Sequence, residues 1–322
     1  MPDSPEKDMR ILIIGAGAVG GYFGARLHAA GRDVTFLVRP HRAEQLRRSG
    51  LDLATDQGDL HIEPRLMLAS DLAAAQAFDL TILSTKAYSL PQAIEDFAPA
   101  VGPDTAILPL VNGMKHLDLL DAAFGPAHVL GGATRINADL DPDGRVIQDG
   151  PLHDIIFGER DKSLTPRVQR IDATLRDCGF PTTLSPDVLA AMWMKWTLLS
   201  SLAGATCLLR GTIGEIASTP GGAEISAAIV RESAAIAAAN GYPQSPDFLS
   251  AHTARLADPD STQSASMYRD LLKGAPVESE HILGDLLARG RAHGVDAPLL
   301  RAAFVQLSIY SASRQAAENA SN

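Results

Sequence analysis

Three glycines near the start of the chain have the spacing of a phosphate-binding turn. They read Gly15-x-Gly17-x-x-Gly20, directly after an apolar run at residues 11–14 and directly before a helix-like stretch that closes at Gly31. A strand, a tight turn and a helix N-terminus in this order present backbone N–H groups to a pyrophosphate. A chance glycine turn is the alternative, but the flanking pattern favours a dinucleotide site. Its residues would be Gly15, Ala16, Gly17, Ala18, Val19 and Gly20.

The next apolar stretch, residues 34–38, ends at a basic residue. An NAD enzyme usually offers an acidic side chain to the ribose hydroxyls at this point, whereas this chain has Arg39, with His41 and Arg42 close behind. A guanidinium suits a 2′-phosphate because it donates charge-assisted hydrogen bonds to the phosphate oxygens. We therefore predict NADP(H) rather than NAD(H) as the cofactor, with Arg39 as the phosphate ligand.

Two more polar residues follow predicted strands of the same sheet. Lys86 comes shortly after the apolar run 80–83, and Asn112 directly after the run 106–111. A solvated loop lysine and an ordinary Asn-Gly turn are the plain alternatives. Ligands of open parallel sheets bind at the carboxyl ends of the strands, so this placement favours a role in binding for both residues.

Lys195 is the single charged residue in an apolar stretch that spans residues 188–209. One interpretation is a lysine whose stem lies along a core helix while its ammonium reaches the surface. The other is an ammonium desolvated in a cleft, which releases its proton readily and can protonate a developing alkoxide. Glu278 and Glu280 are the carboxylates that could partner it.

The same stretch is close to the length of a membrane span. A central lysine is costly in lipid, and Trp193 and Trp196 lie near the middle rather than at the ends. We therefore predict a helix buried inside a globular domain.

The composition and the predicted secondary structure of the chain change near residue 184. Before it, strands and helices alternate, which predicts a mostly parallel sheet with helices on both faces. After it, strand signals vanish and long segments rich in alanine and leucine predict helices. The predicted fold class is α/β, with a Rossmann-type dinucleotide-binding domain at residues 1–184 and an all-α substrate domain at residues 185–322. We expect the active site in the cleft between them.

Composition narrows the remaining function classes. A net charge of −10 argues against nucleic acid as a partner. The two cysteines, Cys178 and Cys207, are too few for a disulfide framework and are expected to be buried and reduced. The N-terminus has no signal peptide pattern, so a cytoplasmic protein with no membrane partner is expected. The sequence leaves the oligomeric state open, with a homodimer as one candidate.

Other ionisable residues receive structural interpretations. Asp139, Asp141 and Asp143 lie around a Pro-Gly turn, so no metal site is predicted. His252, His281 and His293 are interpreted as helix-surface or cap residues.

Together these features resemble the ketopantoate reductase (2-dehydropantoate 2-reductase) family over essentially the whole chain. The resemblance rests on the glycine turn, Arg39, residues 85–87, residues 112–114, Gly158-Glu159, Trp193-x-Lys195, Ser266-Met267-x-x-Asp270 and Glu278.

The resemblance implies that hydride passes from NADPH to C2 of a 2-keto acid, with ketopantoate and hence pantothenate biosynthesis as the first candidate. It assigns protonation of the alkoxide to Lys195, assisted by Glu278. It also implies that Asn112 and Lys86 line the cofactor and substrate cleft, and that Ser266 binds the carboxylate end of the substrate.

One departure from the family concerns the substrate. The family usually carries asparagines four and eight residues after the catalytic lysine, whereas this chain has Leu199 and Ala203 there. Lost hydrogen bonds to a substrate change discrimination strongly. A reductase of a more apolar 2-keto acid, similar to the D-2-hydroxyacid dehydrogenases related to this family, therefore stays open. A non-catalytic NADP(H)-binding sensor is the alternative from another class.

Overall fold

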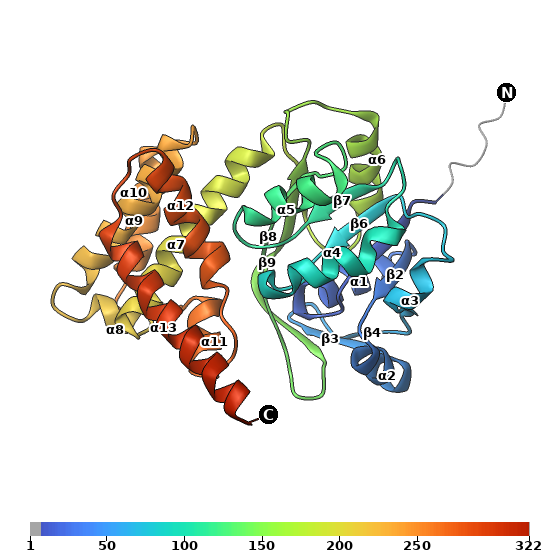
Figure 1. Cartoon of the computed structure of the whole chain (residues 1–322), viewed down its shortest axis with the longest axis horizontal. Helices are drawn as coiled ribbons and strands as arrows, with labels where there is room; N and C mark the ends of the chain where they lie inside the picture. The colour runs from blue at the N-terminus through green and yellow to red at the C-terminus, as the bar shows by residue number, and fades with distance from the viewer. Residues whose placement is uncertain (1–7, 322) are drawn as a thin grey trace. The chain divides into compact units, whose positions relative to one another are not determined.

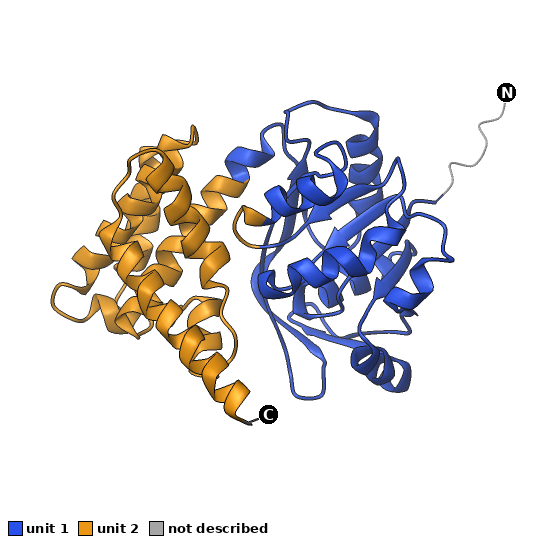
Figure 2. Cartoon of the chain, in the orientation of Figure 1, with its two compact units in different colours: residues 1–111, 116–191 blue, residues 112–115, 192–322 orange. Residues whose placement is uncertain are grey.

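The structure, a computed structural model, describes residues 8–321 (Figure 1). The chain forms two compact units, each described here by itself (Figure 2). Unit 1 comprises the residues up to Val111 and His116–Ala191, and unit 2 comprises Asn112–Lys115 and the residues from Met192. The sequence analysis predicted a boundary near residue 184, whereas these units divide inside a helix and assign the four-residue segment 112–115 to unit 2.

Five parallel strands form the first sheet of unit 1. They are β1 (Arg10–Ile14), β2 (Asp33–Leu37), β5 (Arg65–Met67), β6 (Leu80–Leu83) and β7 (Ala106–Pro109), in the spatial order β5-β2-β1-β6-β7. Strands β1, β2, β6 and β7 are almost wholly buried, as expected for apolar strands covered on both faces. This order reverses direction between β1 and β6, which is the switch point where doubly wound folds bind ligands.

Unit 1 also contains a second, mixed sheet that the alternating pattern did not predict. Its strands are β3 (Leu51–Thr55), β4 (Leu60–Ile62), β8 (Gly131–Leu140), β9 (Val146–Gly158) and β10 (Thr182–Leu184). Strand β9 pairs antiparallel with β8 and parallel with β3 and β10. The sequence pattern predicts two separate strands at residues 145–148 and 155–157, but residues 146–148 and 155–157 belong to this one long strand. Pairing with β8 before and after joins these segments, whereas residues 149–152 between them have no partner in β8 and form an irregularity in the ladder.

The helices of the first half of the chain include one at each range that the sequence pattern predicts, namely near residues 18–30, 41–48, 90–97 and 166–178. They are α1 (Ala18–Ala29), α2 (Pro40–Ser49), α3 (Ala69–Leu72), α4 (Leu90–Phe97), α5 (Lys115–Phe124) and α6 (Pro166–Leu175). The pattern did not predict α3 or α5. Helix α1 lies close to the sheets because Gly24 and Gly21 face Phe36 and Val146 with no room for a Cβ.

Unit 2 is helical, as predicted for the second half. Its helices are α7 (Val188–Leu209, shared with unit 1), α8 (Ile213–Ala217), α9 (Gly222–Ala239), α10 (Pro246–Leu256), α11 (Ser266–Leu272), α12 (Asp285–Ala292) and α13 (Pro298–Ser321). A π-helical turn, Glu280–Gly284, directly precedes α12. Helices α8 and α11 were not predicted, because each is short.

Helix α7 is long and apolar enough to cross a membrane by length and composition, and 56% of its most apolar window is buried. Its contacts are those of a core helix. A Cβ on Gly204 would lie 3.1 Å from Ile229 of α9 and from Leu300 of α13. The Ser200 and Ser233 hydroxyls, on α7 and α9, lie 3.1 Å apart within hydrogen-bond distance.

Two smaller predictions have different outcomes. Cys178 and Cys207 are both free and buried, as predicted, and burial raises the pKa of the Cys207 thiol to about 12. The prediction for His252 was wrong, because this side chain is only 6% exposed. Its helix α10 turns it inward beside Phe248, against which its ring stacks.

Candidate functional site

The glycine turn after β1 is tight toward the protein and open on the other side. Gly15 has φ +90°, a left-handed conformation that favours glycine. A Cβ on Gly20 would overlap the Gly15 carbonyl oxygen and the Ser84 hydroxyl, so the first turn of α1 lies directly against the strand ends. A Cβ on Gly17, by contrast, would meet nothing within 4 Å. Space for a ligand therefore exists at the middle glycine.

The segment after β6 lies next to this turn. The Ser84 hydroxyl donates to the Ile14 carbonyl at 3.1 Å. The Thr85 hydroxyl oxygen is buried and has no hydrogen-bond partner among residues 8–321. Buried hydroxyls are nearly always hydrogen-bonded, so this one is suited to a ligand atom at the turn. Lys86, the residue predicted to bind cofactor, follows and is exposed. These residues fit the phosphates of a dinucleotide.

Arg39 and Arg42 differ in what their guanidinium groups contact. Arg39 is exposed at the carboxyl end of β2, at the N-cap of α2, and makes no side-chain hydrogen bond or ion pair with any described residue. Arg42 is half-buried and donates to the Ala16 carbonyl, to Gln45 and to the Gly144 carbonyl. Arg39 is thus available to an external anion, whereas Arg42 is occupied within unit 1.

The structure brings together two residues that were predicted separately. In unit 2, the Lys195 ammonium donates to the Asn112 side-chain oxygen at 2.9 Å across 83 residues of sequence. Asn112 can lie there because Gly113, at φ +80°, passes so close to the His281 carbonyl that a Cβ would lie 2.5 Å from that oxygen. Lys195 is half-buried on α7, so its ammonium is held in place rather than freely mobile.

The π-helical turn supports the same region of unit 2. The buried Trp196 indole donates to the Ile282 carbonyl at 2.9 Å, which satisfies a backbone acceptor of the turn. Glu278, just before the turn, is 7% exposed. Burial, followed by the charge of Lys115, lowers the pKa of His281. Single π turns occur frequently at functional sites. The sequence predicted a helix over residues 278–293, but no signal distinguished its first turn as π-helical.

Ser266 and the positions after Lys195 are those that the sequence linked to substrate binding. Ser266 is the exposed first residue of α11 and makes no hydrogen bond to Lys195. Leu199 is half-buried and Ala203 is 2% exposed, so neither position offers a polar atom to a substrate. Ser200 and Ser201 do not replace the missing asparagines, because their hydroxyls donate to backbone carbonyls of α7.

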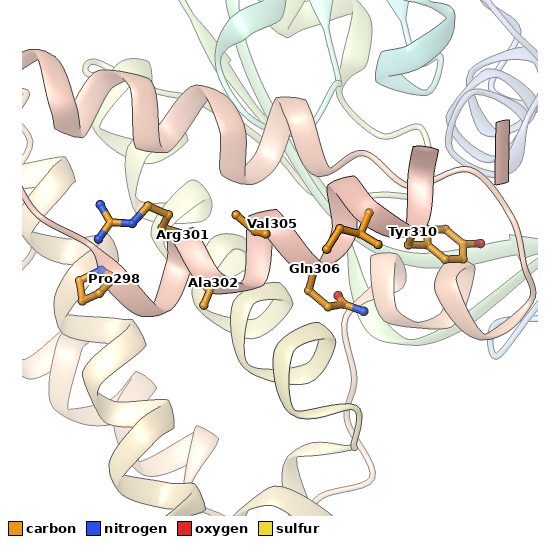
Figure 3. A pocket seen from close by; sticks show the side chains of 7 residues that line it. Pro298, Arg301, Ala302, Val305, Gln306 and Tyr310 are labelled. Atoms are coloured by element: carbon orange, nitrogen blue, oxygen red, sulfur yellow. The ribbon is translucent and has the colours of Figure 1, made fainter. Parts of the chain in front are cut away.

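The remaining observations concern a surface hollow and the side chains that could bind a metal ion. A surface hollow of about 670 Å³ runs along α13 and contains none of the predicted site residues (Figure 3). Its lining comes from one helix: Pro298, Arg301, Ala302, Val305, Gln306, Ile309 and Tyr310. Within residues 8–321, no group of three or more His, Cys, Asp or Glu side chains is arranged to hold a metal ion.

Two family models match the chain. The model described as "Ketopantoate reductase PanE/ApbA" matches residues 11–162, and the model of the C-terminal part of the same family matches residues 187–310. The chain belongs to the ketopantoate reductase family.

Individual relatives cover nearly the whole chain. An uncharacterized oxidoreductase, YkpB of Bacillus subtilis, is 32% identical over 306 residues, which is 95% of this chain and 100% of the relative. The crystal structure of 2-dehydropantoate 2-reductase from Geobacter metallireducens is 26% identical, with a TM-score of 0.85 over 93% of this chain and 99% of its own. D-mandelate dehydrogenase, solved with NADH and anilino(oxo)acetate, shares the fold at 24% identity, with a TM-score of 0.85 over 95% of this chain and 99% of its own.

Proposed function

We propose that this protein catalyses the NADPH-dependent reduction of a 2-keto acid to a 2-hydroxy acid. The observation that carries the proposal is the hydrogen bond from Lys195 to Asn112, because it holds an ammonium, a proton donor, at a fixed position in unit 2. The glycine turn of unit 1 supplies the cofactor site that such a reaction needs.

NADPH, when bound, supplies hydride to C2 of the keto acid. The negative charge that develops on the C2 oxygen requires a proton, and the Lys195 ammonium donates it. Asn112 orients that ammonium through an amide oxygen, which accepts the hydrogen bond without competing for the proton at neutral pH. Glu278 is a buried carboxylate near the π-helical turn, and we assign it the assisting role. Ser266 is proposed to bind the substrate carboxylate.

NADP(H) is proposed over NAD(H) because Arg39 stands where an acidic residue would receive the ribose hydroxyls of NAD. Lys86 and Asn112 are proposed as further cofactor contacts, and Gly15 to Gly20 as the pyrophosphate cradle.

Ketopantoate is the first substrate candidate, since the Geobacter metallireducens relative is named 2-dehydropantoate 2-reductase. In that case the enzyme serves pantothenate biosynthesis in the cytoplasm. A keto acid with an apolar side chain is the second candidate, favoured by the apolar side chains of Leu199 and Ala203 on α7. The partner is a small molecule in both cases, and the homodimer stays a proposal.

The test is steady-state oxidation of NADPH with a panel of 2-keto acids that includes ketopantoate, 2-ketoisovalerate and phenylpyruvate. Turnover with at least one of them, abolished in Lys195→Ala but retained in the matched variant Lys273→Ala, supports the reductase. NADPH binding without turnover of any 2-keto acid contradicts it and favours the non-catalytic sensor.

A further inference from the structure

We propose that Arg42 is a positioning residue for the nicotinamide dinucleotide, because it ties the glycine turn to the tip of the β8–β9 hairpin. The proposal rests on the proposed function in one respect only, namely that such a dinucleotide binds at the turn. It assigns Arg42 a role different from that of Arg39, although the two arginines lie three positions apart in sequence.

The Arg42 guanidinium contacts three separate segments of unit 1. Its Nε donates to the Ala16 carbonyl at 3.1 Å, its Nη1 to Gln45 at 2.6 Å, and its Nη2 to the Gly144 carbonyl at 2.9 Å. All three acceptors are neutral, and Arg42 makes no ion pair with a carboxylate in the part of the chain that the structure describes. Burial lowers the pKa of this guanidinium. The planar guanidinium therefore holds three acceptors in a fixed arrangement, for which a lysine ammonium is a poor substitute.

The contact with Ala16 orients the phosphate-binding backbone. A trans peptide places its C=O and N–H on opposite sides, so fixing the Ala16 carbonyl toward Arg42 directs the Gly17 N–H away from it. A Cβ on Gly17 would meet nothing within 4 Å, and the Gly17 N–H makes no hydrogen bond with a described residue. Arg42 thus presets one of the N–H groups that a pyrophosphate would use.

The hairpin tip is shaped to reach Arg42. Gly144 has φ +82°, and a Cβ there would overlap both the Arg42 Nη1 and the Gln45 Nε2. The Gln45 amide donates to the Asp143 carbonyl at 2.5 Å, which is a second attachment of the tip to α2. Within the tip, the Arg145 N–H donates to the Asp141 carboxylate at 2.8 Å. These contacts make the tip part of the support of the turn.

The first experiment separates positioning from phosphate recognition. Binding of NADPH and of NADH is measured by fluorescence titration without any keto acid, in the wild-type chain, Arg42→Lys and Arg39→Ala. Arg42→Lys is expected to raise both dissociation constants by about tenfold, because misplaced backbone donors weaken contacts that both cofactors share. Arg39→Ala is expected to weaken NADPH alone. A selective loss of NADPH in Arg42→Lys would make Arg42 a phosphate ligand and overturn the proposal.

The second experiment changes the hairpin tip instead of Arg42. Gly144→Ala crowds Arg42, whereas the matched variant Gly150→Ala lies on the same hairpin at φ +78° with nothing within 4 Å of its Cβ. Gly144→Ala is expected to weaken both cofactors equally and to add little further loss in Arg42→Lys, because both changes act on one contact. Equal effects of the two glycine variants, or no effect of Gly144→Ala, contradict the proposal.

A third measurement needs no cofactor. Hydrogen exchange at the amides of residues 141–145 is expected to be faster in Arg42→Lys than in the wild type, with exchange in β1 unchanged. Unchanged protection of the tip overturns the proposal. If Arg42→Lys fails to fold, Gln45→Ala removes the second attachment together with one of the three Arg42 hydrogen bonds. It should give a smaller loss of both cofactors in equal proportion, and a loss confined to NADPH would contradict the proposal. Because none of these readouts uses a keto acid, they stand whether or not the reductase activity is found.

Discussion

The Lys195 ammonium donates to the Asn112 amide oxygen at 2.9 Å. The amide oxygen is neutral and weakly basic, so it orients the lysine without taking its proton. The proton on Lys195 thus remains available to an oxygen that gains negative charge nearby. The hydrogen bond fixes the position of the ammonium that is proposed as the acid, and it underlies the first prediction.

Lys195→Ala is expected to lower kcat by roughly 10²- to 10⁴-fold, the usual contribution of general acid catalysis. NADPH binding should persist, because the glycine turn belongs to unit 1 and Lys195 to unit 2. Stopped-flow and steady-state kinetics measure the rate, and fluorescence titration measures the binding. A variant that retains near-native kcat would exclude Lys195 from the chemistry.

Arg39→Asp is expected to narrow or reverse the preference for NADPH over NADH. Loss of a charged hydrogen bond costs about 1.5–3 kcal/mol, which corresponds to tenfold or more in discrimination. The measurement is the ratio of kcat/KM for the two cofactors, with Arg47→Asp, an exposed position on α2, as the charge-matched control. If the ratio in Arg39→Asp equals that of the wild type, another residue binds the phosphate.

Leu199→Asn is expected to improve the reduction of ketopantoate relative to an apolar keto acid, because it restores a polar atom one turn after Lys195. The double variant with Ala203→Asn should improve it further, since two missing partners together account for a hundredfold or more at about 1–3 kcal/mol each. Ala203 is 2% exposed, so the larger side chain is also expected to lower stability, which thermal denaturation monitors. Efficient use of ketopantoate by the native protein would show that other residues have replaced the asparagines.

His252 is expected to make the fold sensitive to acid. Its ring nitrogens are buried without hydrogen-bond partners among the described residues, and burial, followed by the charge of Arg255, lowers its pKa to about 4. Between pH 6.5 and 4, this histidine therefore binds a proton in the unfolded chain but not in the folded chain. The free energy of unfolding falls as pH falls through that window. The full loss below the window is roughly 3 kcal/mol.

His252→Leu should remove most of this pH dependence while keeping the apolar packing beside Phe248. The measurement is the free energy of unfolding in urea at pH 7 and pH 4.5, and His293→Leu at the exposed end of α12 is the control. The same pH slope in His252→Leu and wild type would mean that other groups govern the acid response.

Trp196→Phe is expected to destabilise the protein by about 1–3 kcal/mol beyond the effect of lost ring area, because the buried Ile282 carbonyl loses its donor. Trp193→Phe is the matched control: it removes a similar area from a neighbouring ring that stacks on Tyr242 without donating a hydrogen bond to a described residue. Chemical denaturation of the two variants gives the difference. Equal destabilisation would mean that the indole N–H contributes nothing measurable.

Local patterns predicted the parts of the fold that depend on neighbours in sequence. The glycine turn, the strand before it and Lys195 on a buried helix all follow from short-range spacing and hydropathy. The second sheet does not, because β9 gains its length from pairing with β8 and β3 rather than from its own composition. The π-helical turn and the Arg42 contacts depend likewise on partners distant in sequence, such as the Trp196 indole and the Gly144 carbonyl.

The segment Asn112–Lys115, a loop that ends at the first residue of α5, belongs to unit 2 although it lies far upstream in the gene. A chimaera that joins the first half of one family member to the second half of another therefore inherits Asn112 from one parent and Lys195 from the other. Such recombinants are expected to lose turnover wherever the two parents place this loop differently, even when each half folds well. Chimaeras that retain turnover would then require residues 112–115 to come from the same parent as the helical half.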